Sequence, residues 1–184
     1  ETLRLQIPAG LNFGMSGIPY WTTDIGGLHR PKDQYVSQAY HELLIRWFEY
    51  GTFCPIFRIH GHQTETAMWK FGPQVEQILH RYDNLRYRLM PYIYSAAWDV
   101  TSQGATMMRA LPFEYPKDPK VTDISDEFLF GPSLLINPVT EPGATSRTVY
   151  LPSGTTWFDF WTGKQNKGGQ TITADAPIDK MPIF

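Results

Sequence analysis

The sequence predicts an α/β region followed by a region rich in β-strands. Residues 18–24 alternate between two faces, as in a strand, and a spacing typical of an amphipathic helix follows over residues 33–51. A second short apolar run at residues 52–61 and a long helical stretch over residues 73–104 repeat this order. Strands that alternate with helices are typical of α/β folds, in which helices cover a sheet.

The helices carry start and stop signals. Asp33 is the expected N-cap of the first helix and Gly51 its expected C′ residue, because aspartate favours N-caps and glycine favours the turn after a helix. Pro91 lies within the long helical stretch. Since proline removes a backbone donor, we expect a kink or a break there.

After Gly104 the pattern changes. Residues 105–184 contain short runs of strand-forming residues separated by proline and glycine, and none has helical spacing over a useful length. This pattern is typical of a β-sandwich, so we expect two domains divided near residue 104. The chain begins without an initiator methionine and ends within a predicted strand, so we expect a fragment of a longer protein in which the sandwich is incomplete.

The composition excludes several classes of protein. The chain has 184 residues, a formal net charge of −2 and no basic stripe, so we expect neither nucleic acid nor a membrane surface as a partner. No apolar run is long enough for a transmembrane helix. Cys54 is the only cysteine, which excludes an internal disulfide and fits a small buried hydrophobe. No phosphate-binding loop or other cofactor motif occurs, so no cofactor is expected.

Three polar residues follow the two predicted strands at their C-terminal ends. Asp24 ends the first strand, and Arg58 and His60 share one face of the second. Doubly wound sheets and (β/α)8 barrels both bind ligands at this edge, so position alone does not distinguish the two folds. Structural roles are the alternatives, with Asp24 capping a turn and Arg58 bonded to His60.

Aromatic and histidine residues near these strands also have alternative roles. Tyr20, Trp21 and Trp69 could each form a platform for a sugar ring, although core packing is the commoner role of such residues. A zinc site at the "HGH" of His60 and His62 lacks a third ligand at a recognisable spacing, so we expect no metal.

One absence limits the chemistry. Glycoside hydrolysis commonly uses two carboxylates about 5–9 Å apart. Asp24 is the only acidic residue at a predicted strand end, and Glu65 lies in the loop after the second strand. The residues alone therefore predict part of an active site, in which Asp24 could be a nucleophile, a general acid or base, a metal ligand or a hydrogen-bond acceptor for sugar hydroxyls.

Motifs along essentially the whole chain occur in a characteristic order. They are "LNFGMSGIPYWTTDIGG", "RWFEYGTFCPIFRIHGH", "WKFG", "LRYRLMPYIYS", "GATMMRAL", "DEFLFGPSLLINPV", "VYLP" and "GTTWFDFWTG". In this order they resemble glycoside hydrolase family 31, the family of α-glucosidases and α-xylosidases. The resemblance is specific because the whole series is present.

The resemblance implies a (β/α)8 barrel followed by β-sandwich domains. Residues 1–104 would be the last strands and helices of the barrel, and residues 105–184 the proximal C-terminal sandwich, truncated. In this family the nucleophilic aspartate and the acid/base aspartate lie on earlier barrel strands. The resemblance therefore places both catalytic carboxylates outside this chain.

The resemblance also implies roles for individual side chains. Asp24 resembles the aspartate that lines the subsite for the non-reducing terminal sugar. His60 resembles the histidine that binds hydroxyls of that sugar, with Arg58 beside it. Leu28 stands where the family commonly has an aromatic residue close to the sugar. Trp21 also belongs to the predicted substrate-binding set, as an aromatic platform and not through the resemblance.

The function expected from the resemblance is that of a retaining α-glycosidase. It would remove a terminal α-xylosyl or α-glucosyl residue from an oligosaccharide or α-glycoside, and we favour the α-xyloside. The isolated chain is predicted to be inactive. Two alternatives remain at this point: a non-catalytic carbohydrate-binding fragment, and a lyase or transglycosylase built on the same scaffold.

Overall fold

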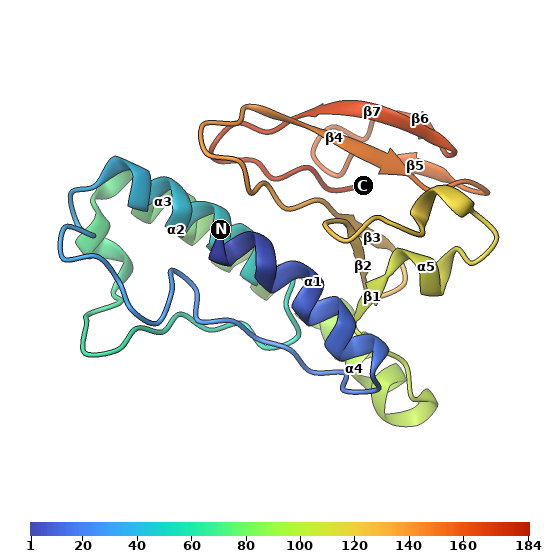
Figure 1. Cartoon of the computed structure of the whole chain (residues 1–184), viewed down its shortest axis with the longest axis horizontal. Helices are drawn as coiled ribbons and strands as arrows, with labels where there is room; N and C mark the ends of the chain where they lie inside the picture. Colours follow the sequence, from blue (N-terminus) through green and yellow to red (C-terminus); the bar gives the residue numbers. More distant parts are fainter.

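Four helices form a layer between the strands and two long loop segments (Figure 1). The computed structural model describes all 184 residues. The helices are α1 (Thr2–Met15), α2 (Gln38–Gly51), α3 (Pro73–Arg88) and α4 (Met90–Gln103). None of them is both long and apolar enough to cross a membrane.

The two predicted strands, residues 18–24 and 52–61, do not form a hydrogen-bonded ladder. Residues 52–56 are turns and bends that follow α2 directly, and the two segments meet in one parallel bridge, between Ile25 and Ile59, and one backbone hydrogen bond, from the Ile56 N–H to the Trp21 carbonyl at 3.1 Å. The prediction of two full strands was therefore wrong. Parallel strands of α/β folds lie within a sheet and have neighbours, whereas each segment here has only the other to pair with.

The alternation predicted for the first segment nevertheless holds. Thr23 is buried on the helix side, where its hydroxyl accepts a hydrogen bond from Trp47 Nε1 at 2.7 Å. Trp21 packs on that side as well, with its ring centroid 5.3 Å from that of Phe13 and its indole against Gly10 of α1. The side chains that alternate with these buried residues therefore lie on the opposite face of the segment.

The predicted caps of α2 were wrong at both ends. Ser37 is the N-cap, and its hydroxyl accepts from the Tyr40 N–H at 3.4 Å, whereas Asp33 lies in the turn before it. Gly51 is the last helical residue and has no left-handed φ. A Cβ at Gly51 would clash with the Ile25 side chain, so close packing requires the glycine.

The break predicted at Pro91 is confirmed. α3 ends at Arg88 and α4 begins at Met90, with Leu89 between them. Pro91 lies in the first turn of α4, where its missing N–H costs no intrahelical hydrogen bond. α4 ends at Gln103, and its C-cap Gly104 has a φ of 68°, the left-handed conformation that glycine adopts readily.

α1 was not predicted from the sequence, because it contains Pro8 and has only a weak amphipathic pattern. Its buried residues Leu3, Ile7 and Leu11 recur every four residues and pack into the core. Tertiary packing rather than local preference therefore holds this helix.

The β-rich region forms three small antiparallel sheets, and the prediction of an α/β region followed by a β region is confirmed. The sheet orders are β1-β2-β3, β4-β7 and β5-β6. The strands are β1 (Met108–Ala110), β2 (Phe128–Phe130), β3 (Leu134–Ile136), β4 (Ser146–Leu151), β5 (Thr156–Phe158), β6 (Gln165–Lys167) and β7 (Gln170–Asp175). Two short helices, α5 (Leu111–Glu114) and η2 (Pro119–Val121), lie in the connections of this region, and η1 (Met68–Phe71) lies between α2 and α3.

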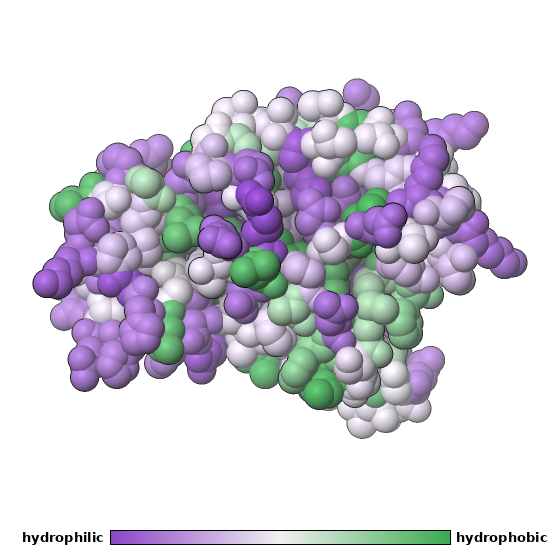
Figure 2. All heavy atoms as spheres, viewed as in Figure 1, coloured by the Kyte–Doolittle hydropathy of each residue, from purple (hydrophilic) through white to green (hydrophobic).

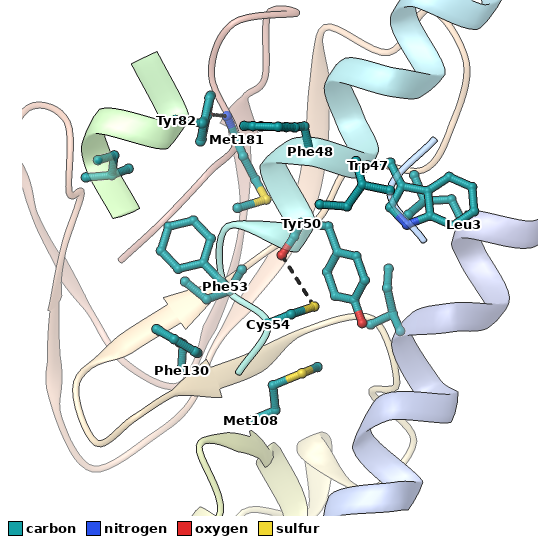
Figure 3. Packing of buried hydrophobic residues seen from close by; sticks show 14 of the residues in the cluster. Leu3, Trp47, Phe48, Tyr50, Phe53, Cys54, Tyr82, Met108, Phe130 and Met181 are labelled. Carbon is teal, nitrogen blue, oxygen red and sulfur yellow. Dashed lines mark hydrogen bonds between the residues drawn. The ribbon is translucent and has the colours of Figure 1, made fainter. Parts of the chain in front are cut away.

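The first sheet lies between two hydrophobic cores. Phe128, Phe130 and Ile136 belong to the larger core of 29 buried residues, which they share with the helices. Figure 3 shows this core around the end of α2, with the residues Tyr50, Phe53, Cys54, Met108 and Phe130 labelled. Leu129 and Leu135 belong to the smaller core of ten residues beneath β4 and β7. The helical and β regions are therefore joined by continuous packing.

A buried arginine also joins α2 to the C-terminal segment. Arg46 donates to the backbone carbonyls of Ala144, Ala176 and Pro177 at 2.9, 2.8 and 3.1 Å. Its Nη1 lies 3.2 Å from Glu49 Oε2. Burial raises the pKa of Glu49 to about 8, although the charge of Arg46 opposes the shift. We call this set of five residues the junction.

Candidate sugar-binding site

Asp24 and Arg58 meet where the two loop segments cross. Asp24 Oδ1 and Arg58 Nη2 form an ion pair, and both side chains reach solvent, with exposed fractions of 26% and 47%. The bridge between Ile25 and Ile59 brings them together, because each is the residue before a bridged partner. The pair leaves carboxylate lone pairs and guanidinium N–H groups available to a ligand.

His60 lies on the other side of the bridged residue Ile59 and is exposed. Its backbone carbonyl accepts a hydrogen bond from Arg30 Nη2 at 3.0 Å, while its ring makes no hydrogen bond within the chain. The structure thus brings Asp24, Arg58 and His60 to the same end of the two segments. Their polar groups can donate and accept hydrogen bonds, which is the chemistry needed to hold sugar hydroxyls.

The side chains of Trp21 and Leu28 lie in other surroundings, although the backbone of Leu28 accepts a hydrogen bond from the His62 N–H at 2.7 Å. The Trp21 indole is packed on α1, on the helix side of its segment. Leu28 lines a hollow of about 640 Å³ that it shares with Tyr40, Leu43 and Trp47 of α2. None of the three polar residues lines that hollow. Contact of Trp21 or Leu28 with a sugar remains a prediction.

The other aromatic candidates are exposed. Tyr20 is 43% exposed, and Trp69, which lies in η1, is 67% exposed. Arg58 also borders a largely apolar hollow of about 390 Å³, whose walls include Met68 of η1 and Tyr87 of α3. Apolar surface beside polar groups suits a sugar ring, which has both apolar faces and hydroxyl edges.

Of the two glycines that follow Asp24 and Ile25, Gly26 is needed for the packing of the protein itself. Gly26 has a φ of +87°, and a Cβ there would lie 2.8 Å from Tyr40 Oη and 2.9 Å from Arg30 Nη2. The space at Gly26 is therefore occupied by two side chains of this chain.

Two arginines that sequence reasoning missed organise the backbone on both sides of the site. Arg86 of α3 donates to the carbonyls of Thr52, Cys54 and Pro55 at 2.7, 2.7 and 2.9 Å, and burial lowers its pKa to about 10. It therefore holds the turn that leads to Arg58. The second is Arg30, which contacts both loops. No sequence pattern marks either residue, because their partners are backbone carbonyls.

The histidines near the site do not form a metal centre. His29 and His62 meet edge to face, with ring centroids 5.6 Å apart. No group of three or more His, Cys, Asp or Glu side chains is arranged to hold a metal ion.

Figure 2 shows hydrophilic residues gathered at the left, where the two loops lie, whereas apolar residues gather over the ends of α1 and α4.

Comparison with known proteins identifies both parts of the chain. Residues 1–96 match the family model for the glycosyl hydrolases family 31 TIM-barrel domain, and residues 104–184 match that for the glycosyl hydrolase family 31 C-terminal domain. The prediction of a barrel part followed by a C-terminal domain is thereby confirmed.

Individual relatives agree with these matches. An α-xylosidase of Saccharolobus solfataricus is 46% identical over 183 residues, and α-glucosidase 2 of Bacillus thermoamyloliquefaciens is 37% identical over 187 residues. The crystal structure of a family 31 α-xylosidase from Xanthomonas citri superposes with a TM-score of 0.93 at 44% identity, over 98% of this chain and 21% of that one. Both sequence relatives are matched over 100% of this chain, which spans 25% and 23% of their respective lengths.

Proposed function

Because this chain belongs to glycoside hydrolase family 31, we propose that it is part of a retaining α-glycoside hydrolase. The enzyme would remove a non-reducing terminal α-xylosyl or α-glucosyl residue, and this chain would supply residues that bind the sugar. The observation that carries the proposal is the gathering of Asp24, Arg58 and His60 at one end of the two segments. In a (β/α)8 barrel, the catalytic face is built from such segment ends and the loops that follow them.

Each of the three side chains has a role that fits its surroundings. The Asp24 carboxylate accepts hydrogen bonds from sugar hydroxyls, while Arg58 pairs with it and orients it. The His60 ring, which has no partner within the chain, exchanges a hydrogen bond with a further hydroxyl. Such contacts select strongly between sugars, because a missing hydroxyl leaves a desolvated group without a partner.

The substrate that we favour is an α-xyloside. Xylose lacks the exocyclic hydroxymethyl group of glucose, so the two sugars differ in the space needed beyond carbon 5. Leu28 occupies the position where an aromatic residue is common in this family. The α-xylosidase of S. solfataricus, at 46% identity, also supports an α-xyloside, and α-glucosidase 2 of B. thermoamyloliquefaciens supports keeping the α-glucoside as a test substrate.

The two catalytic carboxylates are proposed to lie outside this chain. The full-length protein should therefore hydrolyse p-nitrophenyl α-xyloside or α-glucoside, and the isolated chain should hydrolyse neither. Retention is tested by NMR, because the first sugar released should be the α anomer. Turnover by the isolated chain, or no hydrolysis of either glycoside by the full-length protein, would contradict the proposal.

A further inference from the structure

Arg30 connects the backbones of the two loops that carry the candidate sugar-binding residues. Its Nη2 donates to the carbonyl of Ile25 at 2.7 Å and to the carbonyl of His60 at 3.0 Å. Its Nε lies 3.3 Å from the carbonyl of Gly27. One guanidinium therefore contacts the residue next to Asp24 in one loop and His60 itself in the other.

The backbones of the two segments are also joined directly. They share one parallel bridge, between Ile25 and Ile59, and a hydrogen bond from the His62 N–H to the Leu28 carbonyl at 2.7 Å. Arg30 bonds to carbonyls that lie between these two contacts, so it adds a side-chain connection beside Asp24 and at His60 itself. The planar guanidinium presents several N–H groups in a fixed fork, so it can hold two carbonyls at a defined separation. Arg30 makes no ion pair that would commit its charge elsewhere.

The surrounding residues pack closely around the guanidinium. A Cβ at Gly26 would lie 2.9 Å from Arg30 Nη2, and a Cβ at Gly61 would lie 3.0 Å from Arg30 Nε. A glycine on each loop thus makes space for the group. The side chain is half-buried, and burial lowers its pKa.

We propose that Arg30 is a positioning residue that sets the separation of Asp24 and His60 so that both reach the same sugar ring. The inference rests on the proposed function, since it concerns the geometry of that binding site. Arg30 acts through backbone carbonyls and makes no contact with substrate in this role. Small displacements of binding groups are costly, because a misplacement of about 1 Å can reduce catalysis by about 100-fold.

The test uses Arg30→Met and Arg30→Lys in the full-length protein. Methionine keeps an unbranched chain but donates no hydrogen bond, whereas lysine keeps the charge and can reach one carbonyl. We expect Arg30→Met to lower kcat/KM by about 10- to 100-fold, chiefly through a higher KM and weaker binding of a competing monosaccharide. Arg30→Lys should recover part of the loss.

The matched control is Arg81→Met, which removes an arginine of α3 that pairs with Asp179 of the C-terminal segment and bonds to neither loop. This control should keep the kinetics of the wild type. If Arg30→Met remains folded and keeps kcat/KM within about threefold of the wild type, the proposal is overturned. The proposal is equally overturned if Arg30→Lys loses as much as Arg30→Met.

Hydrogen exchange separates this inference from the proposed function. In the sugar-free protein, Arg30→Met should speed amide exchange in both loops, at residues 24–28 and 60–64, and Arg81→Met should not. Unchanged exchange in either loop overturns the inference whatever the kinetics. A wild type that hydrolyses no α-glycoside overturns the proposed function instead, and the exchange result still decides whether Arg30 holds the loops together.

Discussion

Two arginine–carboxylate pairs in this chain share the same chemistry but lie in opposite surroundings. Arg46 and Glu49 at the junction are 4% and 1% exposed, whereas Arg58 and Asp24 in the loops are 47% and 26% exposed. Arg46 also bonds to three backbone carbonyls, while Arg58 has no other partner in the chain. Burial thus commits one pair to the fold and leaves the other available to a ligand.

The energetic consequences differ accordingly. Removing Arg46 would leave three backbone carbonyls without their charged donor, and each hydrogen bond to a charged group contributes about 1.5–3 kcal/mol. An exposed pair contributes about 0–1 kcal/mol. Replacement of Arg46 should therefore lower the stability more than replacement of Arg58 does. Replacement of Arg58 should lower the activity more than replacement of Arg46 does.

The largest expected effect is the loss of stability in Arg46→Met. Three backbone carbonyls would lose their charged donor, and so would Glu49, whose pKa burial raises to about 8. We expect the free energy of unfolding to fall by at least about 3 kcal/mol, measured by urea denaturation. Arg58→Met is the matched control and should cost less than about 1 kcal/mol. Equal losses in the two variants would show that burial does not distinguish the pairs.

A pH dependence of stability should follow from the same junction. Burial raises the pKa of Glu49 to about 8 from its ordinary value of 4.5, so the folded state holds a proton that the unfolded state releases. The stabilisation is complete below pH 4.5 and is lost as the pH rises to about 8. Tm should therefore fall between pH 5 and pH 8.

Glu49→Gln is the control for this prediction, because an amide does not titrate. Burial also raises the pKa of Glu127, to about 7, and this group contributes with the same sign. Glu49→Gln should therefore reduce the slope of Tm between pH 5 and pH 7, where Glu127 still contributes, and remove most of the slope above pH 7. A slope in that range equal to that of the wild type would mean that Glu49 is ionised in the fold at neutral pH.

In the exposed region, Asp24→Ala should affect activity far more than stability. Hydrogen bonds to a charged group contribute about 1.5–3 kcal/mol, so kcat/KM should fall by about 10- to 150-fold in the full-length protein. The free energy of unfolding should change by less than about 1 kcal/mol. If the folded variant kept wild-type kinetics, we would conclude that Asp24 has a structural role only.

The smallest expected effect is that of His60→Ala. A neutral hydrogen bond contributes about 0.5–1.5 kcal/mol, which corresponds to a loss of about 2- to 12-fold in kcat/KM. His62→Ala is the matched control, since His62 is an exposed histidine two residues further along the same loop. If the two variants lost activity equally, a general disturbance of the loop would explain the result better than contact between His60 and the sugar.

Several features of this protein were determined by the sequence alone. The order of helices and strand-like segments, the break at Pro91 and the change to β structure after Gly104 follow from local spacing and backbone restrictions. Asp24, Arg58 and His60 were also predicted as neighbours, because an alternating pattern places them at the ends of adjacent segments. These features depend on residues close in sequence, where side-chain type constrains the backbone directly.

The tertiary structure alone decided which arginines hold the fold and the site. Arg30 reaches the His60 carbonyl 30 residues away, and Arg46 reaches the carbonyls of Ala144 and Ala176 at separations of 98 and 130 residues. Every residue carries a backbone carbonyl, so no residue type marks a carbonyl as a partner. Packing alone brings a particular carbonyl to a particular guanidinium, which is why these contacts are visible only in the folded chain.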